Sequence, residues 1–138
     1  MLRNCARCSI DSLDVDHILP QSWHAHWPLT EGTKVSAEEA NQAKVMQFVS
    51  TGLDARMESI INRNKHVLRI GNLTIVHYGV NRSLLNHAFD EKRQAFFDHS
   101  HLQLNRALAK PEIWDESAIQ ERAQTLFAFA VNLWRGPV

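Results

Sequence analysis

Two short segments of the chain have the pattern of apolar and polar residues that is typical of strands. Residues 11–20 (DSLDVDHILP) set single apolar residues among acidic ones and end at a proline, which predicts a short strand. Within residues 66–81 (HVLRIGNLTIVHYGVN), apolar and β-branched residues favour a second strand, with turns at Gly71 and Gly79. Residues 21–35, which lie after the first strand, read as an irregular loop.

Three longer segments carry apolar residues three or four positions apart, the spacing of a helix with one buried face. Ser36 and Glu39 fit a capping box, which predicts one long helix or two shorter ones over residues 37–62, with Gly52 as a weak point. Residues 88–100 (AFDEKRQAFFDHS) predict another helix. Asp115 would cap a last helix that carries Ile119, Ala123, Leu126, Ala130 and Trp134. We expect the Phe and Trp stripe of this helix to be core rather than a base-stacking surface.

These elements predict a helix-rich α+β fold with a two-stranded sheet, and the 138 residues suit a single domain spanning 1–138. Fifteen basic residues balance fifteen acidic ones, so bulk charge does not hold this chain to nucleic acid, although a local basic groove would fit. There is no signal-peptide pattern and no apolar run of membrane-spanning length. We therefore expect a soluble, cytoplasmic protein, and one that could be part of a larger chain.

The two cysteines, Cys5 and Cys8, are too few for a closed four-cysteine zinc site. His24 and His26 in WHAHW could complete a Cys₂His₂ set, but the H-x-H spacing is tight for that geometry. The sequence therefore predicts two reduced thiols rather than a structural zinc.

The most distinctive polar residues are Asp16 and His17, which are adjacent at the end of the first predicted strand. Neighbouring strand residues point to opposite faces, so a site that uses both requires the regular strand to break there. Pro20 forces such a break. The second strand region adds two asparagines in a strand-then-turn setting, Asn72 and Asn81.

Several short motifs in this order resemble those of HNH nucleases, including the HNH domain of CRISPR effector nucleases. They are D-H-I-L-P-Q, G-N-L-T, a later asparagine, F-x-x-K-R and a terminal W-x-x-x-x-I-x-x-R-A-x-x-L. Together they most closely resemble the C-terminal nuclease domain of the GmrSD type, found in modification-dependent restriction proteins. The resemblance extends from about residue 5 to residue 134, nearly the whole chain.

The resemblance implies a ββα-metal core that holds one divalent cation and hydrolyses DNA phosphodiester bonds. His17 would be the general base, and Asp16 and Asn81 would be metal ligands. Asn72 would support catalysis by hydrogen bonding across the loop to hold the His17 segment in its bent shape. Carboxylate and amide oxygens are hard donors, so Mg²⁺ or Mn²⁺ is expected.

For DNA contact, the candidates are Arg82, Lys92, Arg93 and Gln21; a solvated helix face is the alternative for Lys92 and Arg93. The resemblance also implies a role in defence against foreign or modified DNA, with sensing and nucleotide hydrolysis in a separate N-terminal domain or subunit. Two other hypotheses are a catalytically silent DNA-binding module and a zinc-stabilised interaction domain. The sequence does not indicate an oligomeric state.

Overall fold

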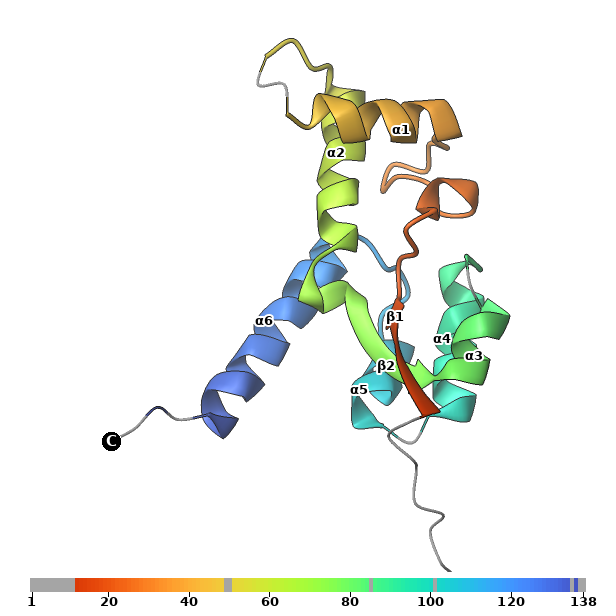
Figure 1. The fold of residues 1–138 in the computed structure, drawn as a ribbon, viewed down its shortest axis with the longest axis vertical. Helices are drawn as coiled ribbons and strands as arrows, with labels where there is room; N and C mark the ends of the chain where they lie inside the picture. The colour runs from red at the N-terminus through yellow and green to blue at the C-terminus, as the bar shows by residue number, and fades with distance from the viewer. Residues whose placement is uncertain (1–11, 49–50, 85, 101, 135, 137–138) are drawn as a thin grey trace, which may run out of the picture.

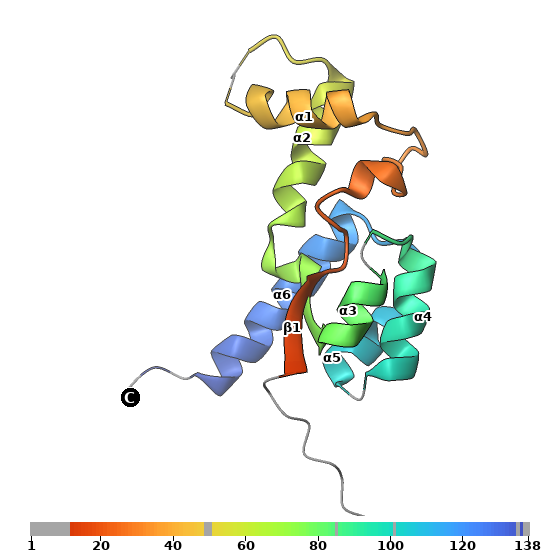
Figure 2. The ribbon, with the colours of Figure 1, turned by 45° about the vertical axis from the view of Figure 1, so that its right-hand side comes forward.

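A computed structural model describes residues 12–48, 51–84, 86–100, 102–134 and 136. A small antiparallel sheet lies in the middle of the molecule, with α3 (Tyr78–Leu84) and α4 (Phe89–His99) on one side and α6 (Glu116–Leu133) on the other (Figures 1 and 2). The predicted helix-rich α+β class is confirmed. Cys5 and Cys8 lie outside the described residues.

The sheet consists of β1 (Leu13–His17) and β2 (Leu73–His77), so both strands are shorter than the segments that predicted them. Their register pairs Asp16 with Thr74 and His17 with Leu73. Because paired residues share a face, Asp16 lies beside the buried Thr74, on the side covered by helices. β1 ends at His17, and the fully buried Ile18 and Leu19 carry the chain into the core.

The predicted helical region after residue 36 is confirmed as two helices, α1 (Ala37–Met46) and α2 (Ala55–Val67), the second reaching beyond residue 62. The Ser36–Glu39 capping box is present, and Asp54 caps α2. Gly52 separates the helices with φ +84°, a left-handed conformation that favours glycine. The loop before α1 contains one short 3₁₀ helix, η2 (Trp23–Ala25).

The predicted turn at Gly79 is wrong, because the chain passes directly from β2 into α3. Gly79 is the second residue of that helix and Asn81 the fourth. A 3₁₀ helix before β2, η3 (Ile70–Asn72), holds Gly71 at the predicted turn. β1, β2 and α3 together form a ββα unit, the core that the family resemblance implies, although α3 was not among the helices predicted from the sequence.

The predicted helix over residues 88–100 is confirmed as α4, and Asp115 caps α6 as expected. Two short elements that the sequence did not predict connect them, α5 (Gln103–Arg106) and the 3₁₀ helix η4 (Ala107–Ala109). None of the helices in the described part of the chain is long and apolar enough to span a membrane.

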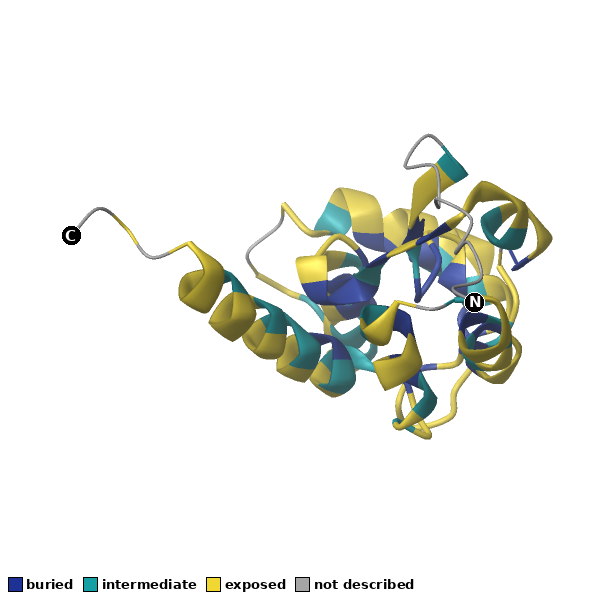
Figure 3. Cartoon of the chain, turned by 90° about the horizontal axis from the view of Figure 1, so that it is seen from below, coloured by how far each residue is buried: buried dark blue, intermediate teal, exposed yellow. Residues whose placement is uncertain are grey.

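The prediction that the Phe and Trp stripe of the last helix is core is wrong, because Phe127, Phe129 and Trp134 are 70%, 65% and 77% exposed. Among the other predicted apolar positions of α6, Ile119 is fully buried and Ala123, Leu126 and Ala130 are half-buried. Figure 3 shows the helix running out towards the C-terminus with much of its surface exposed. The first turns of α6 pack on the domain, and the later ones extend beyond it.

The core joins the loop after β1, the α1–α2 pair and the inner faces of α4 and α6. A buried guanidinium crosses it: Arg63 of α2 contacts Glu116 at the start of α6, with Nε 2.7 Å from Oε1, and also donates to the carbonyl of Pro28. This contact fixes α2 and the loop around residue 28 against α6.

Candidate active site at the end of β1

Alternation along β1 directs Asp14 and Asp16 towards the side of the sheet that carries α3 and α4. Asp16 is 7% exposed, and its Oδ2 lies 3.1 Å from the ammonium of Lys92, which is 0% exposed. Burial raises the pKa of Asp16, although Lys92 and His17 both act to lower it. Burial also lowers the pKa of Lys92, with the Asp16 carboxylate opposing.

The same ammonium donates to the backbone carbonyl of His17, at 2.7 Å. Lys92 therefore contacts both residues of the Asp16–His17 pair, one through its side chain and one through its main chain. The sequence offered a phosphate contact or a solvated face for Lys92, and its complete burial on Asp16 and His17 rules out the solvated face. The apolar spacing of α4 did not predict that Lys92 is buried, because its burial depends on a carboxylate from a strand that is distant in the sequence.

The His17 ring is half-buried and has no hydrogen-bond partner among the described residues. Burial lowers the pKa of His17 below its usual value of 6.5, with Asp16 raising it and Lys92 lowering it further. The imidazole is consequently neutral at neutral pH, so a nitrogen lone pair is available to accept a proton.

Asn72 is fully buried and holds the chain just after His17. Its Nδ2 donates to the carbonyls of Leu19 and Val67, at 2.8 and 3.0 Å. Its Oδ1 accepts from the Leu19 amide at 2.8 Å and from the Trp114 indole at 3.1 Å. The amide thus makes all four hydrogen bonds open to it, and the Asn72 backbone carbonyl accepts a further one from Ile18 at 2.9 Å.

Asn81 lies within α3 and not in a turn, and it contacts the sheet at Asp14. Its Nδ2 donates to Asp14 Oδ2 at 2.9 Å, joining α3 to the start of β1. Asp14 was not among the site residues predicted from the sequence. The signal was nonetheless present, because Asp14 stands two residues before Asp16 and shares its face of the strand.

A family model described as "GmrSD restriction endonucleases, C-terminal domain" matches residues 3–129, more than nine-tenths of the chain. The chain belongs to this family. It is therefore a restriction endonuclease domain, as its motifs predicted. No curated protein and no solved structure matches it.

The other residues predicted to contact DNA in this GmrSD-type domain lie at different depths. Arg82 of α3 is exposed, with its guanidinium 5.5 Å from the centre of the Tyr78 ring, and Gln21 is also exposed. Arg93 is engaged within α4 and its surroundings, since it donates to the Pro111 carbonyl at 3.1 Å and pairs with Asp90. Arg82 and Gln21 are therefore freer to reach a nucleic acid than Arg93.

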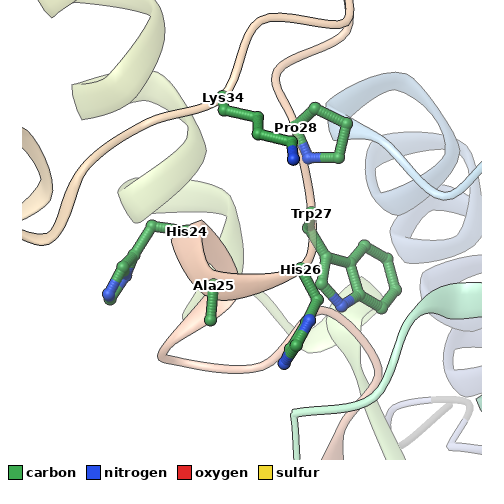
Figure 4. Close-up of a pocket in the computed structure, with 6 residues that line it drawn as sticks. All are labelled: His24, Ala25, His26, Trp27, Pro28 and Lys34. Atoms are coloured by element: carbon green, nitrogen blue, oxygen red, sulfur yellow. The ribbon is translucent and has the colours of Figure 1, made fainter.

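His24 and His26, the candidate partners of the cysteines, line a small pocket of about 170 Å³ with Trp27, Pro28 and Lys34. Figure 4 shows their rings apart, on either side of Ala25. Within the described residues no three His, Cys, Asp or Glu side chains are grouped as a metal site. The proposed Cys₂His₂ set includes Cys5 and Cys8 and so lies outside what is described.

A wider groove of about 860 Å³ lies between α6 and residues 103–114, and none of the residues at the end of β1 lines it. The candidate site of the GmrSD-type domain is instead on the sheet and its adjoining helices. Such a surface suits a substrate that is a long polymer, since a DNA backbone does not need to enter an enclosed cavity.

Proposed function

We propose that this GmrSD-type domain is an HNH endonuclease that hydrolyses DNA phosphodiester bonds with one divalent metal ion. Family membership supports the nuclease activity. The observation that carries the finer proposal is the position of His17, which stands next to the buried Asp16 carboxylate at the end of β1, with a half-buried ring that has no hydrogen-bond partner among the described residues. In this role His17 takes the proton of the attacking water.

Asp16 and Asn81 are the proposed ligands of the ion, and Asp14 lies beside Asn81 on the same side of the sheet. The donors are oxygens of carboxylates and an amide, which fit Mg²⁺ or Mn²⁺ and not zinc. When bound, such an ion polarises the scissile phosphate and stabilises the charge on the leaving oxygen. The protein's part is to hold these oxygens and His17 in place, through Lys92 and Asn72.

Contacts with the DNA backbone are assigned to Arg82 and Gln21. The formal net charge of zero favours a few local contacts over a broad basic surface. We further propose that target choice, directed to foreign or modified DNA in antiviral defence, lies with an N-terminal sensing and nucleotide-hydrolysing domain or subunit of the same system. This division leaves cutting to the domain described here, in the cytoplasm.

The test is cleavage of supercoiled plasmid DNA by the purified domain with Mg²⁺ or Mn²⁺. Nicking or cutting is expected, and EDTA should abolish it. His17→Ala should lower the rate at least 10²-fold while leaving the circular dichroism spectrum and melting temperature unchanged, because the ring makes no hydrogen bond to any residue that the structure describes.

His26→Ala is the matched control, since His26 is exposed in the neighbouring loop, and it should cleave like the parent. Cleavage by His17→Ala at the parental rate would refute the assignment of the base. DNA binding by the parent without any metal-dependent cleavage would instead support the silent DNA-binding module.

A further inference from the structure

Lys92 is a fully buried cation that contacts the residue proposed to hold another cation. Two of its three N–H groups are used, one on Asp16 Oδ2 and one on the His17 carbonyl, and its side chain is 0% exposed. No other acidic side chain among the described residues pairs with it. The ammonium is thus committed to the Asp16–His17 segment.

This contact has an electrostatic consequence for any ion on Asp16. The carboxylate and the ammonium cancel in formal charge, so Asp16 offers a divalent cation little net attraction. Two like-signed charges a few ångströms apart in a partly buried site repel strongly, because little water separates them. The affinity of oxygen-ligand sites depends on how many uncompensated carboxylates they contain.

We propose that Lys92 is a positioning residue that holds Asp16 and His17 in their working arrangement without metal and keeps metal binding by the free domain weak. This inference rests on the metal-dependent function proposed above. It implies that the ion is bound well only when a DNA phosphate adds negative charge. The domain alone would therefore carry little metal until DNA arrives.

A lysine with a merely structural role would give a different result when it is replaced. Loss of a purely structural contact loosens the site and weakens metal binding. Under our proposal, loss of Lys92 should instead strengthen metal binding, because it leaves Asp16 as a buried, unpaired carboxylate for which a divalent ion is the best available partner.

The experiment measures Mn²⁺ binding to the DNA-free domain by isothermal titration calorimetry, comparing the parent with Lys92→Met. The variant should bind Mn²⁺ at least tenfold more tightly. Equal or weaker binding by a folded Lys92→Met protein would overturn the proposal.

Three controls separate charge from other effects. Lys92→Arg keeps the positive charge and should bind Mn²⁺ as weakly as the parent. The double variant Lys92→Met with Asp16→Asn removes both charges and should lose the gain. Lys44→Met, on the exposed face of α1, removes a lysine charge elsewhere and should change nothing.

If Lys92→Met does not fold without metal, circular dichroism is followed while Mn²⁺ is added. Recovery of the folded spectrum supports the proposal, and failure to recover at 10 mM or so of Mn²⁺ overturns it. Binding is measured without cleavage, so the two proposals fail separately. A parent that cleaves DNA although Lys92→Met gains no affinity refutes only this inference; tighter binding without cleavage by the parent refutes only the nuclease function.

Discussion

At the scale of single residues, the candidate site is held by two side chains that are themselves completely buried. Lys92 fixes the Asp16 carboxylate and the His17 carbonyl, and Asn72 fixes the backbone of Ile18 and Leu19 immediately afterwards. The strand ends between these two anchors. Asp16 and His17 can therefore have different roles although they are adjacent, because side chains of α4 and η3 fix the backbone around them.

Asn72→Ala should be strongly destabilising. The substitution strands the amide of Leu19, the indole N–H of Trp114 and two carbonyls in the core, each at a cost of roughly 1–3 kcal/mol. We expect urea denaturation to show a loss of at least about 3 kcal/mol in the free energy of unfolding. Asn62→Ala, on the exposed face of α2, should stay within about 0.5 kcal/mol. A loss below about 1 kcal/mol for Asn72→Ala would contradict the anchoring role.

At the scale of elements, the sequence correctly predicted the helix starts that depend on hydrogen bonds between nearby residues. Ser36 with Glu39 and Asp115 marked the starts of helices through hydrogen bonds made within a few residues, and those starts are confirmed. The start of α3 has no comparable sequence signal: the side chain before it that accepts from its first turn is His77, whose Nδ1 lies 3.2 Å from the Gly79 amide nitrogen, and histidine is not a typical capping residue. Its position depends on β2 before it and on the Asn81–Asp14 contact with another strand.

The candidate-site residues also divide into those that a local motif identifies and those whose role depends on distant segments. Asp16, His17, Asn72 and Asn81 could be selected by motif, because the order of residue types is written in the chain. The burial of Lys92 and the partnership of Asp14 with Asn81 could not, since each depends on segments more than sixty residues apart. The exposure of the late turns of α6 was also beyond the sequence, because an apolar stripe does not say whether anything packs against it.

The contact between η3 and α6 gives a prediction for Gly71. A Cβ on Gly71 would overlap the carbonyl oxygen of Ile119 and come within 3.0 Å of the Ala123 Cβ, all on the rigid first turns of α6. Gly71→Ala should therefore push α6 away from η3 and lower the free energy of unfolding by at least about 2 kcal/mol, measured by urea denaturation. Gly136→Ala, with no atom within 4 Å of its Cβ, should have almost no effect. Equal stability of the two variants would show that α6 is not packed this closely.

At the scale of the whole molecule, two parts of the domain meet through one buried ion pair. The α1–α2 pair lies on one side of it, and α6 with the sheet lies on the other (Figure 1). Arg63, whose side chain is 2% exposed, joins them by contacts to Glu116 at 2.7 and 3.1 Å. Apolar packing continues around this pair, and the pair is a buried polar contact that helps to specify how α2 and α6 are placed.

This ion pair should make the stability of the domain depend on pH. Burial acts to raise the pKa of Glu116, but hydrogen bonds from Arg63 outweigh it, so the folded-state pKa lies below the usual 4.5. A depressed pKa means that the stabilisation is fully present above about pH 4.5 and is lost as the pH falls through the folded-state value. Glu116→Gln should cost about 3 kcal/mol at pH 7, because it leaves the Arg63 guanidinium buried without a counter-charge.

The measurement is urea denaturation between pH 7 and pH 3 for the parent and Glu116→Gln. The stability difference between the two proteins should be constant above pH 5 and shrink below pH 4.5, because acid removes in the parent the charge that the variant already lacks. Glu121→Gln, on an exposed part of α6, should follow the parent at every pH. A difference that stays constant down to pH 3 would mean that Glu116 stabilises the domain through its shape and not its charge.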